Sequence, residues 1–145
     1  MKTPEVFDKM IVVDAKDLIL GRLATFVAKK ALLGEEVRVV NSEEAIITGN
    51  KQQIFAKYRG LREMGEPFHG PFYPTRPEAM LKRAIRNMVG YKSPRGKIAL
   101  QRIKCYNKVP YELKDAKRIT IEKANVSKVS NPKKVTLKEV SQFLK

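Results

Sequence analysis

The feature that most constrains the fold of this chain is a strand, a helix and a second strand in close succession near its amino terminus. Residues 10–13 are an unbroken apolar run, typical of a strand buried on both faces. Apolar residues then recur at helical spacing over residues 20–31, and Gly34 offers a left-handed helix stop. Residues 37–40 are the second strand. The pattern predicts a βαβ unit of about thirty residues with a right-handed crossover.

Periodicity and breaker residues predict the rest of the secondary structure. A third strand is expected over residues 45–47, so that the amino-terminal third builds a small parallel sheet. Downstream we expect a helix over 49–59, a helix that opens at Thr75 and runs to Val89, where Gly90 closes it, a helix over 93–102, and a core strand over 103–106. The side chains expected to pack inward from this part of the chain are Ile54, Phe55, Tyr58, Met80, Ala84, Met88, Ile98, Ala99 and Ile103.

Three helix starts carry capping signals. Two T-x-x-E capping boxes and one Ser-Pro start are expected to begin helices, at Thr75 with Glu78, at Thr136 with Glu139, and at Ser93 with Pro94. Val135 and Val140 flank the second capping box at the spacing of a hydrophobic staple. The chain is therefore expected to end in a well-marked helix.

Positive charge is concentrated in one region. Residues 51–110 hold fourteen Lys and Arg against three Glu, a net charge of +11 out of a total of +15. Residues 1–50 carry a net charge of −1, so the expected sheet scaffold is nearly neutral. A local block of this density attracts a polyanion, which neutralises it by releasing counterions. Nucleic acid is the partner that this pattern favours.

Composition fits a single globular domain over residues 1–145, with 43% hydrophobic and 31% charged residues. Cys105 is the only cysteine, which excludes an intrachain disulfide or a CxxC metal site and favours a reducing, cytosolic compartment. No apolar run reaches the roughly eighteen residues of a membrane span, and the first nine residues lack the apolar core of a signal peptide. No membrane partner is expected.

Residues suited to catalysis are few. His69 is the only histidine and has no neighbouring carboxylate in the sequence to orient it, so we interpret it as a loop side chain that packs or stacks. Cys105 falls in an expected strand, where an inert core thiol is favoured over a nucleophile. A nucleotide-dependent enzyme on a Rossmann-like sheet remains an alternative, but only Gly21 lies where a G-x-G-x-x-G fingerprint is needed. No enzyme activity, metal, cofactor or small-molecule substrate is expected.

The basic block combines side chains that recognise RNA. Arginine forks and lysines bind phosphates, and aromatic rings accept unstacked bases. Lys82, Arg83 and Arg86 are expected on one face of a helix, and residues 60–77 form a proline- and glycine-rich loop with four aromatic side chains, counting His69. The candidate RNA-binding residues are Lys51, Lys57, Arg59, Arg62, His69, Arg76, Lys82, Arg83, Arg86, Tyr91, Lys92, Arg95, Lys97 and Arg102.

Three stretches of the chain resemble a known family. VVDAKDLILGRLATFVAKKALLGEEVRVVNSEEAIITGNK is similar to the amino-terminal half of the universal ribosomal protein L-thirteen family. GPFYPTRPEAMLKRAIRNM and SPRGKIALQRIKCYNKVPYELKDAKR resemble its archaeal and eukaryotic branch, in the region that faces rRNA. The resemblance covers about residues 10–118 and leaves 119–145 as a carboxy-terminal extension.

The resemblance implies a three-layer α/β/α fold with a four-stranded, mainly parallel sheet. It also implies a structural role in the cytoplasmic large ribosomal subunit, with rRNA and neighbouring ribosomal proteins as partners and with binding early in assembly. A free RNA chaperone or translational regulator is a further alternative, because the same cations suit RNA that is not ribosomal.

Overall fold

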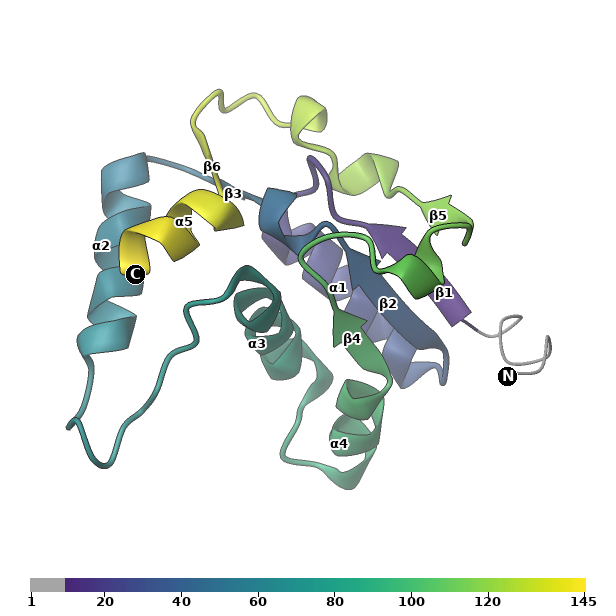
Figure 1. The fold of residues 1–145 in the computed structure, drawn as a ribbon, viewed down its shortest axis with the longest axis horizontal. Coiled ribbons are helices and arrows are strands. Elements are labelled where there is room, and N and C mark those ends of the chain that lie inside the picture. Colours follow the sequence, from purple (N-terminus) through teal and green to yellow (C-terminus); the bar gives the residue numbers. More distant parts are fainter. Residues whose placement is uncertain (1–9) are drawn as a thin grey trace.

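The computed structural model describes residues 10–145 and shows an α/β fold built on a four-stranded parallel sheet (Figure 1). The α-helices are α1 (Leu20–Leu32), α2 (Lys51–Glu63), α3 (Pro77–Val89), α4 (Pro94–Gln101) and α5 (Leu137–Leu144). The strands are β1 (Met10–Asp14), β2 (Glu36–Val40), β3 (Ile46–Thr48), β4 (Ile103–Cys105), β5 (Arg118–Ile119) and β6 (Lys134–Thr136). Short 3-10 turns are η2 (Ser42–Glu44), η3 (Tyr111–Leu113), η4 (Glu122–Ala124) and η5 (Val126–Lys128).

The predicted βαβ unit is confirmed as the centre of the fold. The sheet has the order β4-β2-β1-β5, and all three pairings are parallel. In the central pair, Val13 lies opposite Val39 and Met10 opposite Glu36. The apolar residues of α1 that were predicted from the sequence face this sheet. Gly34 follows the end of α1 and has a φ of 100°, as expected for a left-handed helix stop.

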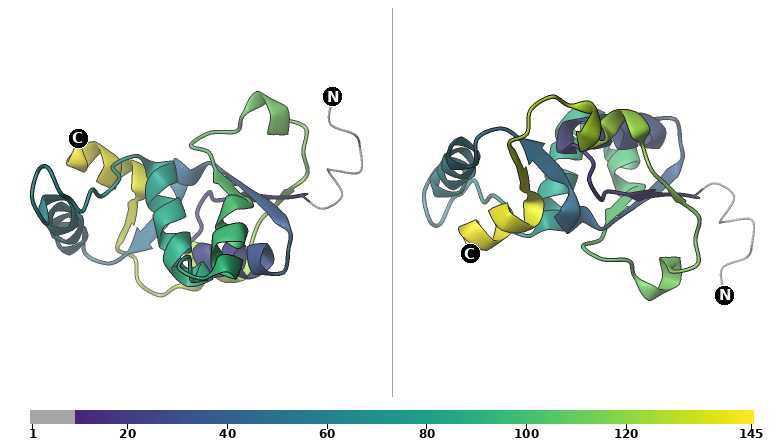
Figure 2. Two further views of the ribbon diagram at one scale, coloured as in Figure 1. Left: turned by 90° about the horizontal axis from the view of Figure 1, so that it is seen from below. Right: turned by 90° about the horizontal axis from the view of Figure 1, so that it is seen from above.

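The two faces of the sheet are covered differently. Val13, Val37 and Val39 belong to the main core, where α1, α3 and α4 pack together on one side of the sheet. Val12 and Val40 point the other way, into a small cluster completed by Leu113 of η3. Figure 2 shows the segment with η3 on the side of the sheet opposite α3 and α4. The fold class is as predicted, and the third layer consists of this short segment instead of a long helix.

The third strand does not extend the main sheet, contrary to expectation. β3 pairs antiparallel with β6 near the carboxy terminus, with Ile46 opposite Thr136, and forms a separate two-stranded sheet. The amide of Ile46 does donate to the carbonyl of Leu18 near β1, which keeps the small sheet against the core. A two-residue period predicts that a segment is a strand, but not which partner it pairs with.

The carboxy-terminal extension is an integral part of the core. The hydroxyl of Thr136 accepts a hydrogen bond from the amide of Glu139 at 3.3 Å, which confirms the predicted N-cap of α5. Val135 and Val140 are both buried, as the hydrophobic staple requires. Phe143 of α5 stacks on Phe55 of α2 with ring centroids 4.3 Å apart, so the last helix fastens α2 to the rest of the molecule.

Two details predicted for α3 are wrong. The Thr75–Glu78 capping box does not form, because Arg76 occupies the N-cap position and Pro77 the first helical position. Proline disfavours helical dihedrals in the residue before it, and Arg76 is extended with ψ at 137°. Met88, predicted to be buried, is 44% exposed. The buried stripe instead consists of Pro77, Met80, Leu81, Ile85 and Val89.

The turn from α3 into α4 is tight and well capped. Gly90 ends α3 at a φ of 66°, and the hydroxyl of Ser93 accepts from the amide of Gly96 at 3.1 Å, so both predicted signals are confirmed. Ala99 is buried as expected, but Ile98 is 51% exposed, because α4 rests on α1 and α3 through its small residues Gly96 and Ala99.

The aromatic loop is shorter than predicted, because α2 continues through Gly60 to Glu63. Leu61 packs against the core one residue later, which offsets the cost of about 1 kcal/mol for a glycine inside a helix. Residues 64–76 then form the loop that projects from the body of the molecule between α2 and α3 (Figure 1). At its tip the amide of Gly70 donates to the carbonyl of Glu66 at 2.9 Å.

Candidate nucleic-acid interface

The predicted site residues of α2 lie on the side of the helix away from the main core. Lys57 and Arg62 are exposed. Lys51 pairs with Glu139 of α5 at 3.4 Å, an exposed contact that solvent screens, and Arg59 lies 4.8 Å from the ring centroid of Phe143. Two of the four predicted cations of α2, Lys51 and Arg59, therefore contact α5.

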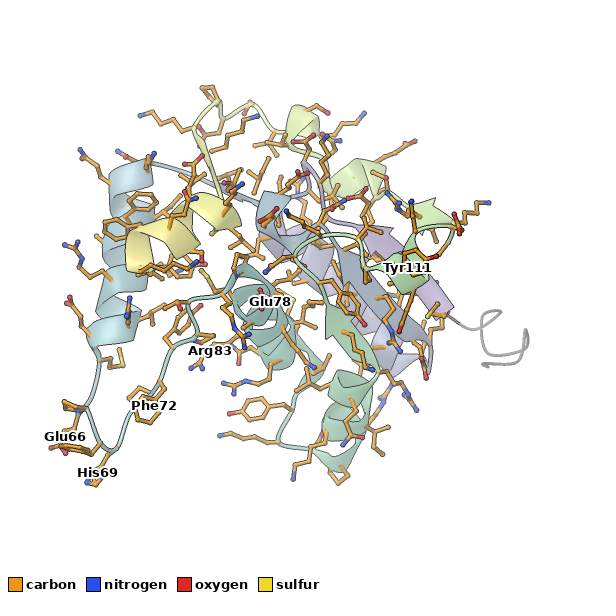
Figure 3. All side chains as sticks on the ribbon, viewed as in Figure 1. Glu66, His69, Phe72, Glu78, Arg83 and Tyr111 are labelled. Carbon is orange, nitrogen blue, oxygen red and sulfur yellow. The ribbon has the colours of Figure 1, made fainter. Side chains whose placement is uncertain are left out.

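The tip of the loop presents aromatic side chains to solvent. Phe68 is 91% exposed and Phe72 is 70% exposed, although both are large and apolar. Figure 3 shows Glu66, His69 and Phe72 on the part of the chain that stands furthest from the sheet. The side chain of His69 is 79% exposed, so it does not pack against the protein, which corrects that part of the prediction. A carboxylate also lies near it, since Glu66 Oε2 is 4.0 Å from His69 Nε2, but both side chains are largely exposed and form no enclosed catalytic pair.

The three cations predicted on one face of α3 do come together. Lys82, Arg83 and Arg86 are half-buried and line a hollow of about 270 Å³. The guanidinium of Arg83 lies 4.8 Å from the ring centroid of Tyr73, and that of Arg86 lies 4.4 Å from the ring centroid of Tyr91. Each arginine therefore rests on an aromatic face, which limits its rotamers and adds a cation–π attraction.

The turn after α3 and the start of α4 carry the next group of predicted cations. Lys92, Arg95 and Lys97 are all exposed. Arg95 is separated from the α3 hollow, because it lines a different groove with Met88 and the carboxy-terminal end of α1. That groove is largely apolar, and Leu33 on its edge is 65% exposed.

Two further predicted residues, Arg102 and Arg76, also have contacts within the protein. The guanidinium of Arg102 donates to the carbonyl of Ala31 at 3.1 Å and so caps the end of α1. Arg76 pairs with Glu78 at 3.5 Å across the start of α3. Arg38, which is buried in β2, donates to the carbonyl of Arg102 at 3.1 Å and pairs with Glu36 at 2.8 Å. Arg38 and Arg102 therefore join β2, the start of β4 and α1.

Burial shifts the ionisation of groups beside this surface. Desolvation raises the pKa of Tyr58 to about 12, with a smaller contribution from neighbouring Tyr73, whose ring packs edge-on at 5.9 Å. Desolvation likewise raises the pKa of Cys105 to about 12. A thiol that stays protonated at neutral pH is a poor nucleophile, so the prediction of an inert Cys105 is supported. The core contact considered for Tyr58 is confirmed, since it is buried.

Sequence reasoning missed the partners that position these cations. Tyr73, Phe68, Phe72 and Phe143 were not among the predicted site residues, yet they hold arginines or stand exposed at the loop tip. The four aromatic positions of the loop were a usable signal. The contact between Phe143 and Arg59 was not, because 84 positions separate them in the chain.

Over residues 10–145, no group of three or more His, Cys, Asp or Glu side chains could hold a metal ion. In the same part of the chain, no helix is long and apolar enough to cross a membrane. The turn between β1 and α1 places Gly21 inside the helix, and its Cβ position is open, so it does not serve as a phosphate-binding loop glycine.

The fold and this surface define a class of protein: a small basic α/β domain whose cations are spread over helices and a projecting loop. The family model for Ribosomal protein L13 matches residues 8–112, and the chain belongs to this family. "Large ribosomal subunit protein uL13" of Methanococcoides burtonii is 47% identical over 135 residues, which cover 93% of this chain and 97% of that protein. The protein of the same name from Methanosarcina barkeri is 48% identical over 92% of this chain and 96% of its own.

A third relative of that name, from Archaeoglobus fulgidus, is 43% identical over 94% of this chain and 88% of its own. All three relatives are archaeal, which agrees with the branch identified from the sequence. The family consists of structural proteins without enzymatic activity, so the nucleotide-dependent enzyme is ruled out. The matches to the relatives extend well beyond residue 112, where the family model ends.

Proposed function

We propose that this chain is a structural component of the cytoplasmic large ribosomal subunit, where it binds rRNA and supports assembly. The observation that carries the proposal is the group of three half-buried cations on α3, which has no acidic side chain in its lining. The names of the archaeal relatives supply the subunit. Neighbouring proteins of the large subunit are further proposed partners.

The distribution of the cations favours a folded RNA over a short strand. They lie on α2, on α3, and on the turn into α4, with a projecting aromatic loop between the first two. A structured RNA offers phosphates on several sides, together with unpaired bases that stack on exposed rings such as Phe68. In this proposal the sheet and its helices hold the contacts at fixed separations, and the phosphate contacts set the orientation of the protein on the RNA.

Salt dependence tests the electrostatic part of the proposal. If about six to ten phosphates are neutralised, affinity for a large-subunit rRNA fragment falls by roughly 10³ to 10⁵ between about 50 and 200 mM salt. Arg83→Glu with Arg86→Glu is expected to reduce the salt slope by about 2 and to retain a folded circular dichroism spectrum. A flat salt response in the unaltered protein contradicts the proposal.

The matched control changes the same amount of charge elsewhere. Lys128 and Lys133 are exposed in the carboxy-terminal extension and lie outside the predicted set, so Lys128→Glu with Lys133→Glu tests net charge alone. Equal losses in the two double variants would mean that the cations of α3 have no particular role. Co-sedimentation with large subunits at moderate salt distinguishes a stoichiometric ribosomal component from a free RNA-binding regulator, which stays in the supernatant.

A further inference from the structure

The hollow on α3 has a lining without negative charge. Its lining consists of three cations, Lys82, Arg83 and Arg86, and three apolar residues, Pro74, Ala79 and Leu100. Among the described residues 10–145, none of these three cations takes part in an ion pair. The acid one turn earlier on the helix, Glu78, does not line the hollow; its Oε1 pairs with Arg76, and its Oε2 is buried without a hydrogen-bond partner in the described part of the chain. Three like charges therefore share one concave surface, an arrangement that an anion stabilises.

Aromatic rings hold the two arginines in place before any ligand arrives. Tyr73 comes from the loop before α3 and Tyr91 from the turn after it, so the two rings come from segments at opposite ends of the helix. Figure 3 shows Arg83 extending from α3 toward the loop. A guanidinium stacked in this way keeps the donors on its edge free, and it loses less conformational freedom when it binds.

One donor in this group lacks an acceptor. The Nε of Arg86 is buried and has no hydrogen-bond partner within the described part of the chain. A buried donor without an acceptor is destabilising, and such atoms in folded proteins usually mark a missing partner. Nε and one terminal nitrogen of a guanidinium together form the fork that binds two oxygens of a phosphate or carboxylate. The unpaired donor thus has the chemistry for an oxyanion.

From these observations we propose that the hollow is a phosphate site, and that in the complex it takes one backbone phosphate of the RNA. Lys82 supplies a point charge, while Arg83 and Arg86 supply directional donors. The lining also includes the apolar residues Pro74, Ala79 and Leu100, which offer contacts to the carbons of the adjoining ribose. That the bound phosphate belongs to RNA rests on the proposed function. That the hollow binds an oxyanion does not depend on the proposed function.

The experiment uses inorganic phosphate as the probe and the full chain as the receptor. Arginine side-chain Nε–H resonances are recorded by ¹H–¹⁵N NMR during a phosphate titration in which sodium chloride keeps the ionic strength constant. The expected result is a saturable shift of the Arg86 resonance, accompanied by Arg83, with Arg22 and Arg118 unchanged. Shifts of equal size in all arginines, or no shift at Arg86, overturn the proposal.

Variants connect the shift to the hollow. Lys82→Gln with Arg83→Gln is expected to weaken phosphate binding about ten- to hundredfold, because two charge-assisted contacts are removed. Lys128→Gln with Lys133→Gln removes the same charge from exposed positions away from the hollow and is expected to leave the titration unchanged. If the first variant binds phosphate as well as the second does, the hollow is not the site. Arg86→Lys, which keeps the charge but loses the fork, provides a further measure of directional binding.

A competition experiment with RNA tests whether an RNA phosphate and inorganic phosphate bind at the same place. Saturating rRNA fragment is expected to produce the Arg86 shift by itself and to abolish the response to inorganic phosphate, because both occupy one site. RNA that binds with full affinity and leaves the phosphate titration intact refutes an RNA phosphate in this hollow, while the proposed function stands. Phosphate binding without any RNA binding gives the opposite outcome, in which the oxyanion site stands and the proposed function fails.

Discussion

Replacing Gly96 by alanine tests whether the start of α4 packs against the end of α3 as closely as the structure shows. A Cβ at Gly96 would lie 2.1 Å from the carbonyl oxygen of Gly90, 2.5 Å from its carbonyl carbon and 2.6 Å from the carbonyl oxygen of Val89. All three are backbone atoms, so no flexible side chain can move aside to make room. Gly60 is the matched control, because it also lies within a helix but has no atom within 4 Å of the Cβ position.

The two substitutions are expected to change stability in opposite directions. Alanine is favoured over glycine inside a helix by about 0.8–1 kcal/mol, so Gly60→Ala should stabilise the protein by roughly that amount. At Gly96 overpacking against backbone costs about 3 kcal/mol, the upper part of the usual range. If the start of α4 moves to relieve this contact, the N-cap hydrogen bond from the Gly96 amide to the Ser93 hydroxyl is strained. Losing that bond costs about 1 kcal/mol. Since alanine regains about 0.8–1 kcal/mol in helix propensity, the free energy of unfolding of Gly96→Ala is expected to fall by about 2–3 kcal/mol.

Urea unfolding followed by circular dichroism measures both changes, and thermal unfolding checks them. A loss of about 2–3 kcal/mol corresponds to a decrease in melting temperature of roughly 5–10 °C for a chain of this size. The tight turn also positions Tyr91 under Arg86, so Gly96→Ala should weaken RNA binding without any change in charge. If Gly96→Ala is as stable as the unaltered protein or more so, α4 is not packed against the end of α3 and the reasoning is refuted.

Three further predictions follow from the core, the extension and the buried titratable groups. Val27→Asp or Val39→Asp places an unpaired charge in the main core and should lower the melting temperature sharply in a thermal scan, whereas an unchanged melting temperature would contradict the assigned core. Phe143→Ala removes the stack that fastens α5 to α2 and should lower both urea stability and RNA affinity, while loss of affinity at unchanged stability would point to a direct RNA contact. Because the folded-state pKa of Cys105 is raised from 9.0 to about 12, its contribution to stability is complete below pH 9 and is lost as the pH rises toward 12. The decrease in urea midpoint between pH 7 and pH 10.5 should be smaller in Cys105→Ala, in which only Tyr58 and the other alkaline groups still titrate, and alkylation of Cys105 should be slow in the folded protein and fast in urea.

Signals carried by a few adjacent residues predicted local structure well. Ser93 and Thr136 cap their helices as expected, and Gly34 and Gly90 have the positive φ that their positions require. A cap depends on backbone amides within three residues of the side chain, so its chemistry is contained in the local sequence. One local prediction was wrong at Thr75, because the restriction that proline places on the preceding residue prevailed over a capping box.

The charge pattern likewise predicted the candidate surface at the level of whole elements. The clustering of Lys82, Arg83 and Arg86 followed from helical spacing, since residues one turn apart share a face. Their function in RNA binding stays a prediction. Which face of α3 is buried did not follow, because Met88 and Val89 are both apolar and lie about 100° apart around the helix.

The amino-acid sequence by itself determined the central βαβ unit, the helix ends marked by Gly34, Gly90, Ser93 and Thr136, and the location of the positive charge. Only the tertiary structure decided that β3 pairs with β6, that Phe143 stacks on Phe55, and that Tyr73 and Tyr91 hold the arginines of α3. These pairings join segments far apart in the chain or side chains on different elements. Local periodicity carries no information about such partners, because the partner is chosen by how the whole core packs.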